Sequence, residues 1–245
     1  QKFFIHWAPY AVHTPLMAPE ELVEKYKRKA GGKQKNPIYA AMVENLDQNV
    51  GKVLAALDRL KLSDKTLIIF TSDNGGLIGN PANPITNNDP LRSQKGYPYE
   101  GGIRVPTVVK WPGKVPAGVQ SNLPIMTLDW APTILEYMGL NPHEQSLDGQ
   151  SLVEVLRGGT LASRDLFWHF PHYRGADVVP YSIIRSGEYK LIHYFGEQPD
   201  ELYSLVKDPR ETTNLAAQFP DLVIQLKASL KAWWLETGAR LPKKK

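Results

Sequence analysis

The sequence predicts an α/β fold class, continued by a small antiparallel sheet and a terminal helix. An apolar helical period runs through residues 37–61, and the continuous apolar run Thr66–Thr71 follows it. A strand, a helix and a buried strand in this order indicate a parallel sheet. After about residue 159, short strand-like segments alternate with turn residues, which predicts an antiparallel meander.

Elements of the first part follow from local patterns. Asn36 caps the long helix and the next residue, a proline, suits its first turn. The loop 75–90 is longer than most connections, which favours a functional role. The expected elements are strands at Lys2–Tyr10, Thr66–Thr71 and Ile103–Trp111, and helices at residues 20–29, 37–61 and 127–138.

The second part is expected to begin near residue 161. Its predicted strands and closing helix are Tyr181–Ser186, Glu188–Phe195, Glu201–Leu205 and Pro220–Trp234. This division predicts two domains, residues 1–160 and 161–245. No internal repeat is present.

Composition limits the function classes. With 42% hydrophobic and 22% charged residues among 245, the chain has globular composition. No apolar run approaches the roughly 20 residues of a membrane span. A net charge of +4 with a lysine-rich end is weak evidence for nucleic acid, so no such partner is expected. Zero cysteines exclude disulfides and thiolate metal sites within this chain. The apolar start without Met leads us to expect residues before Gln1.

Polar residues gather where strands are expected to end. Asp73 and Asn74 follow a predicted buried strand, and their side-chain oxygens are the ligand type that a hard cation takes. A plain Asx-Gly turn is the competing interpretation. Lys95, beside a glycine, can present its charge to an anion. His13 lies just past the first expected strand and can donate a proton to a leaving group.

Further along, Glu100 and Arg104 are expected to pair with each other and to support the Lys95 loop. His169 lies in the aromatic segment Trp168–Tyr173, which we expect to be a loop. Its histidines and aromatic rings suggest a sugar pocket, with a packed aromatic linker as the alternative.

Together these segments resemble the formylglycine-dependent sulfatases of the alkaline-phosphatase-like superfamily, and bacterial carbohydrate and aryl sulfatases in particular. That family shows a His-Thr-Pro turn, a long helix, a strand ending in Ser-Asp-Asn-Gly, a Lys-Gly loop and Tyr-Glu-Gly-Gly-x-Arg-x-Pro. Here the matching segments begin at His13, Ser72, Lys95 and Tyr99, in the same order. The resemblance covers essentially the whole chain. It implies the C-terminal part of the family's mixed α/β sheet domain plus its antiparallel subdomain with a C-terminal helix.

The resemblance also implies chemistry. It makes Asp73 and Asn74 ligands of calcium or magnesium, and Lys95 a sulfate-binding residue. His13 would contact the same sulfate and protonate the leaving alcohol. The implied substrate is a sulfated saccharide or an aryl sulfate, with His169 touching the sugar. A periplasmic or secreted location is favoured by the same resemblance.

One departure is decisive. The family's nucleophile is a formylglycine made from Cys or Ser in a Cys/Ser-x-Pro/Ala-x-Arg motif, and this chain contains no such motif. Two aspartate ligands of the family also have no counterpart. We therefore expect a fragment, inactive alone, whose partner is a missing N-terminal half. The alternatives are a phosphodiester or phosphonate-ester hydrolase of the same superfamily, and a non-catalytic remnant that binds sulfated glycans.

Overall fold

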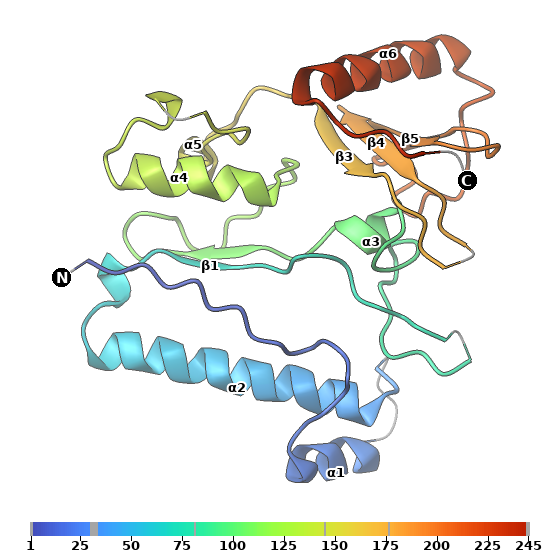
Figure 1. The fold of residues 1–245 in the computed structure, drawn as a ribbon. Helices are drawn as coiled ribbons and strands as arrows, with labels where there is room; N and C mark the ends of the chain where they lie inside the picture. The colour runs from blue at the N-terminus through green and yellow to red at the C-terminus, as the bar shows by residue number, and fades with distance from the viewer. Residues whose placement is uncertain (1, 30–33, 81, 145, 176, 244–245) are drawn as a thin grey trace. The chain divides into compact units, whose positions relative to one another are not determined.

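The computed structural model describes residues 2–29, 34–80, 82–144, 146–175 and 177–243. The chain forms two compact units, which are described separately. Unit 1 comprises the chain up to Leu67 together with residues 76–87. Unit 2 comprises residues 68–75 and 88–245. Figure 1 shows the elements of both in sequence colours.

Unit 1 is built on two helices that pack together, α1 (Glu20–Arg28) and α2 (Pro37–Arg59), followed by the 3-10 turn η1 (Ser63–Lys65). Asn36 caps α2, because its side-chain oxygen accepts hydrogen bonds from the first two free backbone N–H groups. Lys25 on α1 pairs with Glu44 on α2 at 2.7 Å. Both predicted helices are confirmed to within two residues.

Unit 2 contains two sheets. Strands β1 (Ile68–Phe70) and β2 (Val108–Lys110) form an antiparallel pair. Strands β3 (Leu166–Phe170), β4 (Tyr181–Ser186), β5 (Tyr189–Tyr194) and β6 (Glu201–Ser204) form an antiparallel meander in that order. The remaining elements are α3 (Glu100–Ile103), η2 (Thr127–Asp129), α4 (Trp130–Tyr137), η3 (Pro142–Glu144), α5 (Val153–Leu156) and α6 (Pro220–Thr237).

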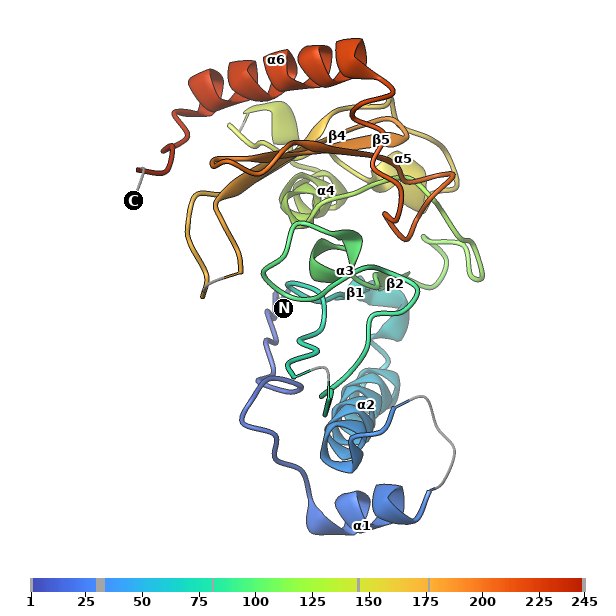
Figure 2. The ribbon, with the colours of Figure 1, turned by 90° about the vertical axis from the view of Figure 1, so that its right-hand side faces the viewer.

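The four-stranded sheet is buried on both faces. Successive residues of a strand point to opposite sides, so Ile184 and Leu191 face α6, where they pack with Leu226 and Leu230. Ile183 and its neighbours on the other face pack with residues of the segment 97–103, which includes α3. Figure 2 shows α6 and α3 on opposite sides of this sheet. The sheet therefore holds the 97–103 segment in place.

One expected strand is absent, two are shorter than expected, and the expected parallel pairing is wrong. Residues 2–10 form no strand, and Phe4 is 74% exposed, because among the described residues no strand pairs with this segment. The run Thr66–Thr71 yields only the short β1, with Phe70 43% exposed rather than buried on both faces. Its partner β2 runs antiparallel, not parallel. Within Ile103–Trp111 only β2 is extended, since the first residue of this range ends α3.

The predicted meander and terminal helix are confirmed. The strands match to within one or two residues, and α6 begins at Pro220 as expected. It ends at Thr237, where Gly238 takes a left-handed conformation at φ 62°. Among the described residues, no helix has the length and apolar character that crossing a bilayer requires.

Candidate functional site

The loop after β1 holds Asp73 and Asn74. The Ser72 hydroxyl donates to Asp73 Oδ1 at 3.4 Å and to the Asn74 carbonyl at 3.1 Å. Asn74 Nδ2 donates to the Gly75 carbonyl at 2.9 Å. That bond orients the amide, and the described residues offer its Oδ1 no donor. The exposed Asp73 carboxylate and the amide oxygen are both available to a ligand.

These two oxygens fit part of a hard-cation site. Calcium takes roughly six to eight oxygen ligands, and magnesium about six. The described residues contain no group of three or more His, Asp or Glu side chains suited to a metal. Asp73 and Asn74 can thus supply two ligands, and a complete site needs others.

Three glycines, Gly75, Gly101 and Gly102, form a close backbone contact that we call the glycine junction. Gly75 N donates to Gly102 O at 3.0 Å, and Gly101 N donates to Arg92 O at 2.8 Å. A Cβ on Gly75 would lie 1.9 Å from Gly101 O, and one on Gly102 would lie 2.4 Å from Tyr97 O. Only glycine permits such approaches. The junction therefore holds the loop of the two metal-ligand candidates against α3, whose glycines in turn contact the backbone of the Lys-Gly loop.

Lys95 lies on that second loop and is partly buried. The next residue, Gly96, has φ +86°, a conformation that favours glycine. The Arg174 guanidinium donates from Nη1 to the Lys95 carbonyl. It also occupies the space beside Gly96, where an added Cβ would meet Nη1 at 1.5 Å. Arg174 was not among the predicted site residues, and it fixes the backbone that carries Lys95.

Glu100 of α3, which follows the Lys-Gly loop in the sequence, is part of a buried ion cluster. The Lys190 ammonium lies 3.0 Å from Glu100 Oε1 and 2.8 Å from Glu211 Oε1. Glu211 Oε2 accepts from the Glu100 backbone N–H at 2.7 Å. Lys190 and Glu211 are fully buried. Burial raises the pKa of the Glu211 carboxyl, and the neighbouring Lys190 charge offsets only part of this.

The expected pairing of Glu100 with Arg104 is wrong. The Glu100 carboxylate binds Lys190 on β5 instead. Arg104 is exposed, and its backbone N–H donates to the Glu100 carbonyl at 2.8 Å, because it caps the C-terminus of α3. A supporting role for Glu100 in this loop stays a prediction, and the contact with Lys190 supplies a means for it.

Arg92 makes a second link between the loop and the C-terminal sheet. Its guanidinium stacks 3.7 Å from the centroid of the Tyr99 ring. Nη1 donates to Tyr203 Oη at 3.0 Å and to the Glu211 carbonyl at 2.7 Å. The planar guanidinium thus stacks on an aromatic ring with its face and donates hydrogen bonds from its edge. The contacts of Arg92, and the contact of Glu100 with Lys190, therefore join this part of the chain to the C-terminal sheet.

His13 belongs to unit 1. It is exposed, and its ring contacts Tyr10 edge-on with centroids 5.2 Å apart. Nδ1 lies 2.7 Å from the Thr14 carbonyl, so a proton on Nδ1 is donated there. Its predicted contact with sulfate stays a prediction, because the other predicted site residues belong to unit 2.

His169 lies in strand β3, so the expectation of a loop is wrong. The segment pairs with β4, placing His169 opposite Ser182. Nδ1 lies 2.7 Å from Ser182 Oγ, and Nε2 lies 2.9 Å from the Arg240 carbonyl. Both ring nitrogens thus have partners within the protein. The predicted sugar contact stays a prediction.

Two family models match the chain. The sulfatase model matches residues 1–140, and the model described as N-sulphoglucosamine sulphohydrolase, C-terminal, matches residues 93–234. Together they span nearly the whole sequence. The overlap at 93–140 includes the Lys-Gly loop and α3.

Curated relatives agree with these models. A sulfatase of Formosa agariphila is 38% identical, over 97% of this chain and 47% of its own length. N-acetylgalactosamine-6-sulfatase of Canis lupus familiaris is 33% identical over 77% of this chain and 33% of its own length. Human arylsulfatase A is 30% identical over 92% and 47%. The chain thus spans half or less of the length of these relatives.

Solved structures share the fold. Ps i-CgsB in complex with k-i-k-neocarrahexaose superposes with a TM-score of 0.78 at 29% identity, over 91% of this chain and 48% of that one. BT4656 in complex with its substrate D-glucosamine-2-N,6-O-disulfate gives a TM-score of 0.70 at 26% identity, over 92% and 47%. With the family model matching more than half of its residues, the chain belongs to the sulfatase family.

Proposed function

We propose that this chain is part of an enzyme that hydrolyses sulfate esters of a sulfated carbohydrate. The glycine junction carries the proposal, because it joins the loop of Asp73 and Asn74 through α3 to the backbone of the loop of Lys95. The oxygens of Asp73 and Asn74 can bind a metal ion, and Lys95 carries a positive charge. Both are suited to binding the sulfate group that is transferred in hydrolysis. The substrate class follows the relatives, since BT4656 is described with a disulfated glucosamine.

Each predicted residue has a distinct task. Lys95 binds the sulfate and offsets charge on the leaving oxygen. His13 protonates the leaving alcohol through its imidazole. Asp73 and Asn74 hold calcium or magnesium, which would offset negative charge on the sulfate.

The nucleophile must come from elsewhere. A formylglycine, as the family resemblance implies, would supply the attacking oxygen, and these 245 residues include no Cys/Ser-x-Pro/Ala-x-Arg motif in which it could form. We therefore propose that another part of the complete enzyme provides it, together with further metal ligands. A periplasmic or secreted location fits an enzyme acting on sulfated polysaccharide.

The first experiment tests the chain alone. Residues 1–245, shown to be folded by circular dichroism, are assayed against an aryl sulfate with calcium, beside Lys95→Ala. We expect no turnover in either. Turnover that Lys95→Ala abolishes would refute the need for a separate nucleophile.

The second experiment tests the metal site in the complete enzyme. Asp73→Ala should lower bound metal, measured by elemental analysis, and activity together. Asp47→Ala, on the exposed side of α2, is the control and should change neither. Unchanged metal stoichiometry in Asp73→Ala would overturn the assignment.

A third experiment separates the two sulfate residues. His13→Ala should slow poor leaving groups more than activated aryl sulfates, because only poor ones need the proton. Lys95→Ala should slow both, because its charge acts on the sulfate itself. Equal losses on both substrates in His13→Ala would argue against its role as the acid.

A further inference from the structure

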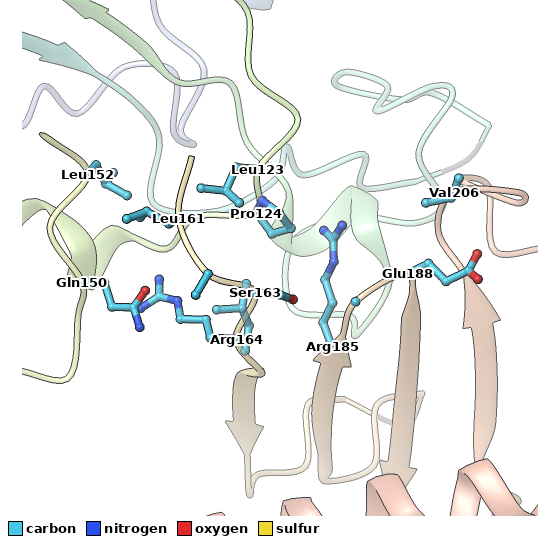
Figure 3. A pocket seen from close by; sticks show the side chains of 13 residues that line it. Leu123, Pro124, Gln150, Leu152, Leu161, Ser163, Arg164, Arg185, Glu188 and Val206 are labelled. Carbon is cyan, nitrogen blue, oxygen red and sulfur yellow. The ribbon is translucent and has the colours of Figure 1, made fainter. Parts of the chain in front are cut away.

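Arg185 lines a cavity of unit 2 that contains none of the residues assigned to sulfate chemistry. Its volume is about 230 Å³. Most of the wall is apolar, formed by the side chains of Leu123, Pro124, Leu152, Leu161, Leu166 and Val206. Figure 3 shows the Arg185 side chain rising from the end of β4 past Pro124 and Ser163.

Within the described residues, the guanidinium of Arg185 forms no ion pair with a residue that lines this cavity, and the opposite charge that acts on it is that of Glu100, outside the lining. Its Nε is buried without a hydrogen-bond partner, and none of its nitrogens donates to an acceptor within the described residues. Burial lowers the pKa of Arg185, and the Glu100 charge counteracts this only in part. A buried donor left without a hydrogen bond is costly, and a ligand that accepts from it would remove that cost.

The other charged groups of the wall are already engaged. Arg164 donates to Asp129 Oδ2, which in turn accepts from the Met126 backbone N–H at 2.7 Å. Glu188 Oε2 accepts from Ser204 Oγ at 2.7 Å. In Figure 3 the Glu188 carboxylate points away from Arg185. Arg185 is therefore the charge of this wall left to bind a ligand.

The shape and charge of the cavity indicate which class of ligand it can bind. A guanidinium edge matches a planar carboxylate with two parallel hydrogen bonds. A single positive charge in an apolar wall suits a monoanion, whereas a sulfate dianion would leave net charge buried. The volume lies below the roughly 300–1,000 Å³ of pockets for drug-sized ligands. A body of a few carbon atoms fits.

We propose that this cavity binds a carboxylate group carried on a small aliphatic body, with Arg185 as its ion partner. The carboxylate can belong to a free short-chain acid or to an acidic side chain flanked by apolar residues. Both sources share the same contact, and separate probes distinguish them. The site takes no part in the proposed sulfate chemistry.

Calorimetric titration of the full chain tests the proposal. The probes are butyrate, its neutral analogue butyramide, sulfate, and the peptide acetyl-Leu-Glu-Leu-amide. We expect butyrate or the peptide to bind and butyramide and sulfate to bind at least about tenfold more weakly. Binding of butyrate identifies a free acid as the ligand, and binding of the peptide alone identifies a side-chain carboxylate.

Variants test whether Arg185 is responsible for the binding of the carboxylate. Arg185→Met should weaken binding about tenfold to hundredfold, as expected for loss of a charge-assisted hydrogen bond. Arg157→Met, at the exposed residue that follows α5, is the matched control and should bind as the wild type does. Ala162→Trp, at an exposed position of the cavity wall, should block binding with the guanidinium intact.

Three results would overturn the proposal. These are binding of neither carboxylate probe, equal binding of sulfate, and equal loss in Arg157→Met and Arg185→Met. If Arg185→Met does not fold, the calorimetric titration of Ala162→Trp tests the proposal in its place. Butyrate and peptide binding as strong in Ala162→Trp as in the wild type would show that the ligand does not bind in this cavity.

Discussion

Arg174 donates a hydrogen bond from its guanidinium to the backbone carbonyl of Lys95, 79 residues away in the sequence. The same guanidinium fills the space beside Gly96. A residue of the segment between β3 and β4 therefore fixes the backbone at the predicted sulfate-binding lysine.

Replacing Arg174 should impair catalysis more than folding. A hydrogen bond to a charged group contributes about 1.5–3 kcal/mol. Arg174→Ala in the complete enzyme should lower kcat/KM for an aryl sulfate roughly tenfold or more, with the melting temperature changed by only a few degrees. Arg157→Ala, which replaces the exposed arginine that follows α5, is the control and should leave kcat/KM unchanged. A loss confined to stability would show that Arg174 does not position Lys95.

Gly96→Ala should act through the same contact. The added Cβ would displace the Arg174 guanidinium, and a φ of +86° would strain any side chain. The variant should lower kcat/KM as Arg174→Ala does. Because both changes remove one contact, the double variant should lose little more than either single one. Fully additive losses would mean that the two residues act independently.

The buried ion cluster predicts a large stability effect. Lys190→Met leaves Glu100 and Glu211 without their cation in a buried site, and removing one partner of a buried pair costs about 3–5 kcal/mol. Urea unfolding should show that loss in the free energy of unfolding. Lys231→Met, at an exposed position of α6, should change it by under about 0.5 kcal/mol. Similar values for the two variants would contradict a structural role for the cluster.

Asp200 should contribute stability that depends on pH. Burial acts to raise its pKa, but hydrogen bonds from His193 and Lys227 outweigh that effect and hold the pKa below its ordinary value of 3.8. A lowered folded pKa contributes stability above pH 3.8, which is lost as the pH falls through the folded pKa. Asp200→Asn should therefore be less stable than the wild type at pH 6, and the difference should shrink below pH 3.8.

Chemical unfolding at a series of pH values measures this difference. Asp221→Asn, at an exposed position near the start of α6, supplies the control curve. If the difference in the free energy of unfolding between Asp200→Asn and the wild type stays constant down to pH 2.5, the hydrogen bonds from His193 and Lys227 are not its cause.

Much of the fold could be predicted because local patterns determine it. The turn residues that separate the short strands of the meander, and the stripe of Leu226 and Leu230 on α6, are local features of the sequence. The wrong predictions concern strands, whose formation depends on hydrogen bonds to a neighbouring strand. Residues 2–10 have strand composition, yet a strand forms only where a neighbour accepts its hydrogen bonds.

The site was predicted only in part, for a similar reason. Asp73, Asn74 and Lys95 stand in recognisable motifs, and the glycines beside them signal close backbone approach. Arg174 and Lys190 act on those motifs across 79 and 90 residues of sequence, and no spacing rule reveals such contacts. Lys190 did leave one signal, a charged residue between the apolar residues of a strand.

His169 allows two roles that experiment can separate. As a sugar contact, His169→Ala should impair a sulfated saccharide substrate and spare a small aryl sulfate. As a structural link, it joins Ser182 on β4 to the Arg240 carbonyl, so the same change should lower stability and leave the ratio of the two activities unchanged. Ser182→Ala is the matched variant, because it removes the partner of Nδ1 while keeping the ring. If His169→Ala alters substrate preference and Ser182→Ala does not, the ring itself touches the sugar. Equal changes in both activities for His169→Ala, with a lower melting temperature in both variants, would assign His169 to the structure of the sheet.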